Sequence, residues 1–215
     1  MSLLFTQSWN VLPGSEDEYE HFISKSYIPR SNELGFNSVG GFYVMSGQGP
    51  RIISVKSVDT IQQLFTILAS KEFEEIKSDL KALVSQYTSR VLVQKRKFGP
   101  EKYSIQEGVW KFNQYFDIRP GKEKCYDDFM ENEFIPAIDK LDYVDFTREW
   151  NILIGGFSEV LLELTFKDPV DIGMFLGSEV FKELTHEMNQ SCGENFNSKI
   201  LKTTERFDKP RWFRL

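Results

Sequence analysis

The hydrophobic and polar positions of the chain follow two periods in turn, one of two residues and one of three to four residues. Two runs rich in aromatic and β-branched residues each stop at a Pro-Gly pair, which is typical of a strand that enters a turn. Two later pairs of extended runs are joined by glycine-containing segments, which is the pattern of a β-hairpin. The pattern predicts strands at 4–12, 36–45, 51–58, 90–97, 110–118, 143–152, 159–166 and 199–206.

Apolar residues at helical spacing fill the longer intervals between these strands. The first helix of each half carries an aromatic stripe, and we expect Pro29 and Pro136 to end these helices because proline lacks the N–H that a helix needs. A serine precedes the later part of each second helix, and Ser70 and Ser178 are the predicted N-caps. The predicted helices cover 15–27, 60–68, 73–84, 126–134, 170–176 and 180–188.

The two halves of this pattern are related by an internal repeat. When the chain is shifted by 107 positions, identical residues coincide in order, and later one-residue insertions fall between predicted elements, where loops accept them. Chance similarity does not explain this ordered spacing. We interpret the chain as two homologous domains, 1–98 and 108–215, joined by a linker at 99–107. The matched identities include Gln7 with Gln114, Tyr19 with Tyr126, Phe22 with Phe129 and Ile28-Pro29 with Ile135-Pro136.

Each half has the order β-α-β-β-α-β, which is the ferredoxin-like unit. Such a unit leaves one face of its four-stranded sheet without helices, and the equivalent face of the other half is the natural cover. We therefore expect an α+β fold in which two tandem ferredoxin-like βαββαβ repeats pack sheet to sheet as a single-chain α+β barrel. Two independent domains are the alternative, but the short linker has few signals of flexibility.

Composition and charge narrow the class of protein. The 215 residues are 40% hydrophobic and 27% charged, which supports a folded core rather than a disordered chain. The net charge of -6 argues against a nucleic-acid partner or an anionic membrane partner. No apolar run is long enough to span a bilayer, and the first residues do not resemble a secretion signal. Cys125 and Cys192 are far apart in the sequence, so we expect a reducing, cytoplasmic location rather than a disulfide scaffold.

Four short motifs are informative about the family: Glu16-x-x-Tyr19-x-x-Phe22, Ile28-Pro29, Val39-Gly-Gly-Phe-Tyr43 and Ser89-Arg-Val-Leu92. They are similar to the NIPSNAP-type branch of the dimeric α+β barrel superfamily, which also contains antibiotic-biosynthesis and heme-degrading monooxygenases. The resemblance covers both halves, and it implies the fold more than the activity. Its members include cofactor-independent oxygenases, isomerases, heme binders and proteins with no assigned activity.

The resemblance also implies where a site would lie. In the family, chemistry takes place in the barrel lumen between sheet and helices, and the heme-degrading members use a first-strand amide, an aromatic residue and a helix histidine. Gln7 and Gln114 resemble that amide in placement, although the family has Asn. His186 lies on a helix that resembles the histidine helix, but it is out of phase with the buried stripe. We therefore expect His186, like His21, to face water.

The candidate site residues are polar or aromatic positions of the predicted strands. Gln7 and Gln114 need partners if buried, either within the protein or from a ligand. Arg148 and Glu163 lie on neighbouring strands and predict either a buried ion pair or an anchor for a polar ligand. We assign no catalytic residue and no metal site. The candidates for the lumen are Gln7, Trp9, Tyr43, Gln114, Phe116, Arg148, Trp150 and Glu163, with Tyr43 and Trp150 at matched strand positions.

Three functions remain open at this point. The first is a barrel that binds a small, partly apolar molecule in its lumen without a cofactor. The second is a cofactor-independent monooxygenase or isomerase, or a heme-binding barrel. The third is a non-catalytic interaction scaffold, for which we expect filled lumens and an exposed apolar patch. In each case the fused halves form an internal pseudo-dimer, and pairing into a larger homo-oligomer is left open.

Overall fold

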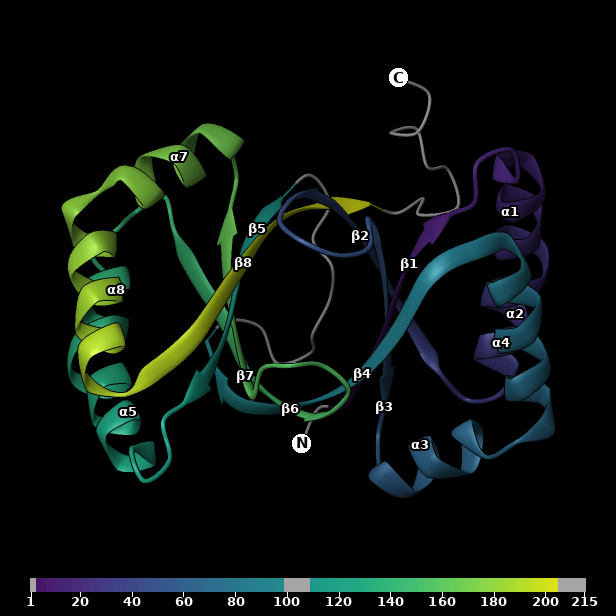
Figure 1. The fold of residues 1–215 in the computed structure, drawn as a ribbon, viewed down its shortest axis with the longest axis horizontal. Helices are drawn as coiled ribbons and strands as arrows, with labels where there is room; N and C mark the ends of the chain where they lie inside the picture. The colour runs from purple at the N-terminus through teal and green to yellow at the C-terminus, as the bar shows by residue number, and fades with distance from the viewer. Residues whose placement is uncertain (1–2, 99–108, 205–215) are drawn as a thin grey trace.

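The computed structural model describes residues 3–98 and 109–204 of the chain (Figure 1). The predicted linker, 99–107, and the C-terminal tail after residue 204 lie outside the described residues, so the domain boundaries stay a prediction. Within the described ranges, none of the helices is long and apolar enough to cross a membrane.

The first half contains four strands and two groups of helices. Its first group is a continuous helical segment in which a π-helical turn, η1, separates α1 from α2. Its second group is the pair α3 and α4. In chain order the elements are β1 (Leu3–Val11), α1 (Glu16–Phe22), η1 (Ile23–Tyr27), α2 (Ile28–Glu33), β2 (Asn37–Ser46), β3 (Ile52–Val58), α3 (Ile61–Leu68), α4 (Lys71–Leu83) and β4 (Val84–Lys97).

The second half repeats this order of elements. It too contains a π-helical turn, η2, between two short α-helical segments. The order of strands and helices in both halves is the one that the sequence predicted. The elements are β5 (Trp110–Ile118), α5 (Glu123–Phe129), η2 (Met130–Phe134), α6 (Ile135–Ile138), β6 (Asp145–Ile154), β7 (Val160–Phe166), α7 (Pro169–Gly177), α8 (Glu179–Ser191) and β8 (Gly193–Thr204).

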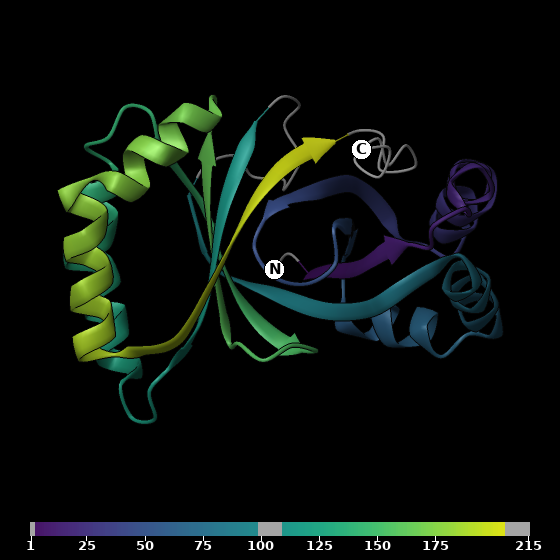
Figure 2. The same cartoon turned by 45° about the horizontal axis from the view of Figure 1, so that its top comes forward.

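The strands of both halves close into one barrel. Their order is β1-β3-β2-β8-β5-β7-β6-β4, and every neighbouring pair is antiparallel. The two halves join where β2 pairs with β8 and where β4 pairs with β6. Figures 1 and 2 show the helices on two opposite flanks with the strands between them. The predicted fold is confirmed, with the two sheets sharing hydrogen bonds at both edges.

The prediction that Pro29 and Pro136 end their helices is wrong. Pro29 is the second residue of α2, which continues to Glu33, and Pro136 has the same place in α6. A π-helical turn precedes each proline, and in η1 the N–H of Ile28 bonds to the carbonyl of Ile23. The wider π-helical turn changes the spacing of the backbone carbonyl groups that precede the proline ring. The helix therefore continues through a residue that usually ends it.

The last strand of each half begins earlier than predicted, at Val84 and at Gly193. Near each start one residue has a positive φ, 53° at Gln86 and 56° at Asn195. The register against the neighbouring first strand shifts at the same place, which is typical of a β-bulge. Because the bulge interrupts the two-residue alternation, the hydrophobic pattern does not reveal these strand starts.

The predicted N-caps of α4 and α8 are confirmed. The hydroxyl of Ser70 accepts a hydrogen bond from the N–H of Phe73 at 3.2 Å. The hydroxyl of Ser178 accepts one from the N–H of Phe181 at the same distance. Both contacts satisfy a backbone donor that the first turn of a helix would otherwise leave without a partner.

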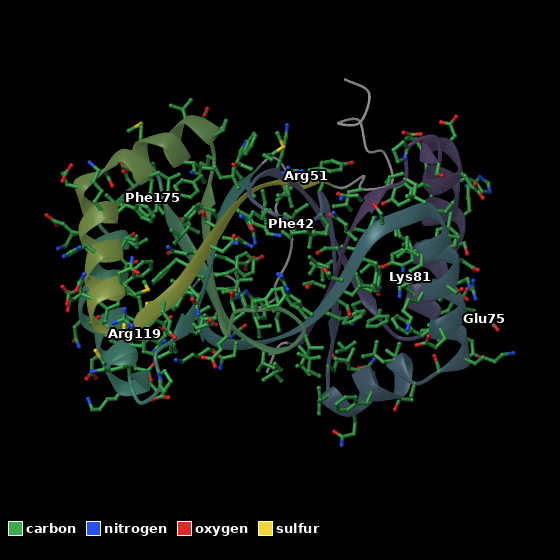
Figure 3. The ribbon with its side chains drawn as sticks, viewed as in Figure 1. Phe42, Arg51, Glu75, Lys81, Arg119 and Phe175 are labelled. Carbon is green, nitrogen blue, oxygen red and sulfur yellow. The ribbon has the colours of Figure 1, made fainter. Side chains whose placement is uncertain are left out.

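Side chains fill three separate spaces. The barrel interior, inside the ring of strands, contains Phe42, Trp150 and Leu201. Figure 3 shows Phe42 between the two sheets and Phe175 close to the helices of the second half. We call the layers between strands and helices the first and second helix–sheet interfaces. The first contains the clusters around Trp9 and around Phe5, and the second contains the cluster around Phe116 and Phe175.

The predicted match between Tyr43 and Trp150 is wrong by one residue. Tyr43 faces the first helix–sheet interface, whereas Trp150 lies in the barrel interior. The interior counterpart of Trp150 is Phe42, because each pairs with an interior residue of the next strand. The one-residue insertion of the second half relative to the first therefore lies before the β6–β7 hairpin. A shift of one residue moves every side chain of a strand to the opposite face.

Candidate functional site

The eight candidate residues do not line a single lumen. Alternate residues of a strand point to opposite sides of the sheet, and the barrel makes these sides into different spaces. Each position can be assigned from its contacts or from the alternation along its strand. Gln7, Trp9 and Tyr43 lie in the first helix–sheet interface, Gln114 and Phe116 in the second, and Arg148, Trp150 and Glu163 in the barrel interior.

Glu163 accepts hydrogen bonds from two neighbours in the barrel interior. Its Oε1 atom lies 3.1 Å from Nζ of Lys111, and its Oε2 atom accepts a hydrogen bond from Nε1 of Trp150 at 2.9 Å. Arg148, which is in register with Glu163 on the next strand, donates to the carbonyl of Phe98 at 3.1 Å. Glu163 thus forms a buried ion pair, and its partner Lys111 was missed by the sequence analysis.

A small cavity lies beside this group in the barrel interior. Its volume is about 30 Å³, and its lining includes Asn113, Tyr115 and Arg90. The Oδ1 atom of Asn113 is buried and has no hydrogen-bond partner in the part of the chain that the structure describes. The cavity has room for about two water molecules, whereas ligand pockets usually measure roughly 300 Å³ or more.

A buried polar cluster surrounds Gln7 in the first helix–sheet interface. The Oε1 atom of Gln7 accepts a hydrogen bond from Tyr27 at 2.6 Å and another from Nζ of Lys56 at 2.9 Å. Its Nε2 atom donates to the hydroxyl of Tyr87 at 2.7 Å. The amine of Lys56 also contacts the hydroxyl of Tyr27 at 2.5 Å and that of Ser54 at 3.4 Å. We call these five residues the Lys56 cluster.

Three strands and a π-helical turn bring the Lys56 cluster together. Gln7 is the register partner of Ser54, so β1 and β3 place it beside Ser54 and, two residues on, Lys56. Tyr27 ends η1 and reaches down to the sheet from the helical layer. Tyr87 comes from β4, the other neighbour of β1. The prediction that the buried amide of Gln7 needs partners is therefore confirmed, and those partners lie within the protein.

Lys56 is the most unusual member of this cluster. Its side chain is 2% exposed, and it forms no ion pair with any acidic residue in the described ranges. Burial lowers the pKa of its amine from 10.5 to about 7. Burial also raises the pKa of Tyr27 and, to a smaller extent, that of Tyr87. At neutral pH this interface contains an amine that is charged only part of the time.

The second half keeps the glutamine and loses the rest of the cluster. Gln114 matches Gln7, but the counterparts of the remaining charged and hydroxyl-bearing residues are apolar. All of these counterparts belong to or pack against the core of the second interface. The replacements are Phe134 for Tyr27, Leu162 for Ser54, Leu164 for Lys56 and Phe196 for Tyr87.

The sequence analysis missed Lys56, Tyr27 and Tyr87 for identifiable reasons. Lys56 interrupts the buried face of its strand, and a lysine in a strand is normally read as solvent-facing. Tyr27 falls in the aromatic stripe of a helix and resembles core. The one usable signal is the comparison of the halves, because Lys56 aligns with Leu164 at the shift of one inserted residue.

Both histidines lie on the surface, as predicted. His21 on α1 and His186 on α8 are exposed, so neither reaches a helix–sheet interface. A heme held by a helix histidine, as the family resemblance implies, therefore does not fit the residues of this chain. Within the described ranges, no three His, Cys, Asp or Glu side chains gather in a way that could hold a metal ion.

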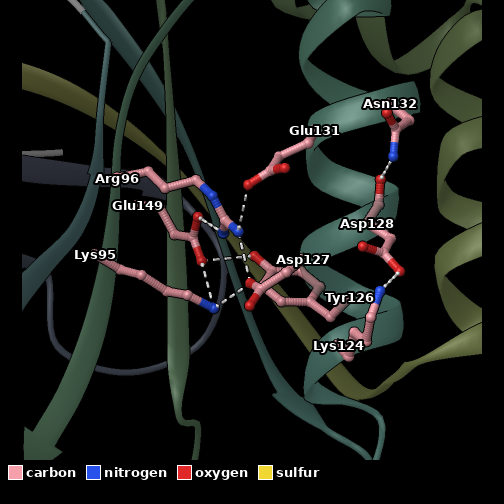
Figure 4. Close-up of polar contacts among 9 residues, drawn as sticks. All are labelled: Lys95, Arg96, Lys124, Tyr126, Asp127, Asp128, Glu131, Asn132 and Glu149. Atoms are coloured by element: carbon pink, nitrogen blue, oxygen red, sulfur yellow. Dashed lines mark hydrogen bonds and ion pairs between the residues drawn. The ribbon is translucent and has the colours of Figure 1, made fainter.

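An ion network ties the end of β4 to α5 (Figure 4). Glu149 is completely buried. Its carboxylate accepts hydrogen bonds from Nη1 of Arg96 at 2.6 Å and from the hydroxyl of Tyr126 at 3.0 Å. Arg96 and Lys95 also bind Asp127 on α5, at 2.6 and 2.7 Å, and these cations lower the pKa of Asp127. Every charge in this network has an opposite partner. We therefore interpret the network as a structural contact that stabilises the association of the two halves, and not as a ligand-binding site.

The two cysteines, which are far apart in the sequence, lie close together in the fold. Burial, with the nearby Cys125 thiol as a further cause, raises the pKa of Cys192. The Sγ atom of Cys125 lies 4.0 Å from the carbonyl oxygen of Ser191, the residue before Cys192. Both are free thiols. An exposed cleft of about 440 Å³ passes beside them, between α5 and α8. The cleft is lined by Lys124, Cys125, Asp128, Phe129, Asn132, Glu133, Glu187 and Ser191.

One apolar surface feature stands out at the turn between β6 and β7. Phe157 is fully exposed, and Leu153 and Ile154 in the same hairpin are about half exposed. Exposed apolar groups of this size often mark contact surfaces.

Comparison with known proteins confirms the fold. No family model matches the chain, and no curated sequence matches it. An anthrone oxidase-like protein is 8% identical, with a TM-score of 0.65, and the match covers 94% of this chain and 91% of that chain. A heme-binding protein from Thermus thermophilus is 14% identical, with a TM-score of 0.61 and coverages of 99% and 94%. A regulator of staphylococcal pathogenesis is 11% identical, with a TM-score of 0.52 and coverages of 95% and 100%.

These similarities define the class of protein: an α+β barrel of the dimeric type, folded from a single chain. At such low identity they show the fold and not the activity, and the different descriptions of these proteins illustrate that one fold supports many functions. A NIPSNAP family protein from Agrobacterium tumefaciens covers 47% of this chain, with a TM-score of 0.38, which is too low to assign the branch.

Proposed function

We propose that the protein binds a small, partly apolar ligand in its first helix–sheet interface, through the Lys56 cluster. One observation carries this proposal: the two halves share the same architecture, yet only the first places a buried amine and two tyrosine hydroxyls beside its glutamine. The second half packs the same positions with apolar side chains, so the fold itself does not require polar ones.

The cost of burying Lys56 supports a functional role. With a pKa of about 7 in the folded chain and 10.5 as its ordinary value, the amine lowers stability by about 4 kcal/mol at pH 7. A leucine at this position, as in the second half, would not carry this cost. Groups with strongly shifted pKa values in uncompensated surroundings are more frequent at functional sites than elsewhere.

The cluster defines the chemistry of the ligand. The amine of Lys56 and the amide of Gln7 can donate to a carbonyl, enol or phenol oxygen. Trp9, whose ring centroid is 5.8 Å from that of Tyr27, and Phe36, 5.7 Å from the Lys56 amine, offer apolar surface for the rest of the molecule. Tyr87 is the partly exposed member, so a ligand would reach the cluster by displacing its ring.

A cofactor-independent enzyme is the more specific form of this proposal. A neutral Lys56 amine can accept a proton from carbon next to a carbonyl, because its pKa lies near the working pH. An isomerase would return the proton to another carbon. A monooxygenase would convert a CH₂ group and O₂ to C=O and water. The similarity in fold to an anthrone oxidase-like protein supports testing this second reaction.

The repeat provides a matched control for the experiment. Anthrone, a flat apolar ketone, is titrated into the wild type, Gln7→Leu and Gln114→Leu, with binding followed by calorimetry. We expect Gln7→Leu to weaken binding about tenfold, equivalent to about 1.4 kcal/mol for a lost buried hydrogen bond, and Gln114→Leu to leave it unchanged. Equal effects of both variants, or no binding to the wild type, would contradict the proposal.

The enzyme form is tested by a separate measurement. Anthrone and oxygen consumption are followed with the wild type and Lys56→Met, after subtraction of the rate without protein. A rate that depends on Lys56 supports the monooxygenase. Binding without turnover leaves the ligand-binding function and rules out this reaction for this substrate.

An interaction protein is the second candidate, and a specific observation favours it. Phe157 is fully exposed, and Leu153 and Ile154 in the same hairpin are about half exposed. A second copy of the chain is a suitable partner for this surface, and light scattering of the wild type and Phe157→Ser at rising concentration tests it. Self-association that disappears in the variant would support this role.

The assignment to the NIPSNAP branch and the cytoplasmic location stay predictions.

A further inference from the structure

Two cations lie close to one aromatic ring inside the barrel. Cζ of Arg90 is 5.3 Å from the ring centroid of Tyr115, and Nζ of Lys199 is 5.9 Å from the same centroid. Arg90 lies on β4 and Lys199 on β8, at matched positions of the two halves. The internal symmetry of the chain therefore brings two equivalent positive charges together in one space.

Neither cation has an acidic partner among residues 3–98 and 109–204. Lys199 is 7% exposed. Glu163, which lines the same cavity as Arg90, is bound to Lys111. Burial, followed by the charges of Arg90 and Arg51, lowers the pKa of Lys199 to about 8.

The turn between β2 and β3 packs against this group. Nη1 of Arg51 donates to the carbonyl of Gly47 at 3.3 Å. Gly47 and Gly49 have positive φ, and a Cβ atom on Gly49 would lie 3.4 Å from Nζ of Lys199. A Cβ atom on Gly47 would lie only 2.6 Å from the carbonyl of Ser198. The close approach of the glycine turn thus keeps Arg51 and Lys199 side by side.

We propose that Arg90 and Lys199, with the exposed Arg51 of the β2–β3 turn beside them, form a binding site for a small oxyanion in the barrel. An anion would neutralise charges that have no acidic partner among the described residues, and buried charges are usually paired. The neighbouring cavity of about 30 Å³ limits the ligand to a small species such as formate or nitrate. The site lies in a different space from the Lys56 cluster and does not depend on the function proposed there.

The test measures anion-dependent stability of the full chain. Urea unfolding midpoints are recorded with sodium formate and sodium nitrate at constant ionic strength, with sodium chloride making up the difference. The variants are Lys199→Met and the control Lys202→Met, which removes a lysine from the other face of the same strand. Arg90→Met repeats the test if Lys199→Met does not unfold cooperatively.

We expect a saturable rise of the midpoint with formate or nitrate in the wild type and Lys202→Met, because a ligand that binds only the folded state stabilises it. In Lys199→Met, or in Arg90→Met, the apparent affinity should fall at least tenfold. A rise of the same size in these variants would overturn the proposal, since it would reflect a general salt effect. The absence of any saturable rise in the wild type would also overturn it.

Discussion

The substitution Lys56→Met tests whether the buried amine is neutral at moderate pH. It replaces a buried lysine by an apolar side chain that fits the same space and resembles the leucine of the second half. In the folded wild type the amine has a pKa of about 7, and its ordinary value is 10.5. Because the variant lacks this amine, the contribution of Lys56 to the pH dependence of the unfolding free energy is absent from it.

The sign of the effect follows from proton uptake. Between pH 7 and pH 10.5 the unfolded chain holds a proton on Lys56, whereas the folded chain has lost it, so stability rises with pH in this window. From pH 7 to pH 9, the wild type should gain about 2 kcal/mol of unfolding free energy relative to Lys56→Met. Well below pH 7 both states are protonated, so from pH 6 to pH 7 the gain should be much smaller than from pH 7 to pH 9.

The assay is urea unfolding of the two proteins at pH 6, 7, 8 and 9. Contributions of other titrating groups, including Lys199, occur in both proteins and cancel in the difference. The control variant Lys202→Met should follow the wild type at every pH. A difference between wild type and Lys56→Met that stays constant from pH 7 to pH 9 would refute the reasoning, because the folded chain would then keep the proton on Lys56.

Three further predictions concern structure outside the proposed site. Ser70→Ala removes the N-cap of α4 and should lower the unfolding free energy by about 1 kcal/mol, measured by urea unfolding. Arg96→Met leaves the buried carboxylate of Glu149 without its guanidinium and should cost about 3 kcal/mol in the same assay; a loss below that of Ser70→Ala would contradict a buried pair. Hydrogen peroxide should join Cys125 and Cys192 in an intramolecular disulfide, with peroxide reduced to water, and peptide mass mapping before and after dithiothreitol would show it; disulfide-linked dimers would contradict the observed proximity.

The fold was predictable because its signals are local and repeated. The alternating strands, the amphipathic helices and the N-caps Ser70 and Ser178 each appear in a short window of sequence, and the repeat supplied each signal twice. The errors occurred where one residue changes the local rule. The π-helical turns before Pro29 and Pro136, and the bulges at Gln86 and Asn195, leave no hydrophobic signature.

The site was only partly predictable because closure of the barrel decides which face a residue joins. Gln7 was identified as a buried amide, but Lys56 and Tyr27 looked like surface and core, since their neighbours come from distant elements. The pair Arg148 and Glu163 was placed correctly on neighbouring strands, yet the binding partner Lys111 lies on a strand whose pairing only the structure reveals.

The central claim is that the amine of Lys56 is partly neutral and contacts a ligand in the first half. The most direct test is NMR of the lysine Cε carbons from pH 6 to pH 10, before and after anthrone is added, with Lys56→Met to assign the signal. The account predicts one lysine that titrates near pH 7, is missing in the variant and shifts when anthrone binds. Titration of Lys56 near its ordinary pKa, or a signal that anthrone leaves unchanged, would contradict it.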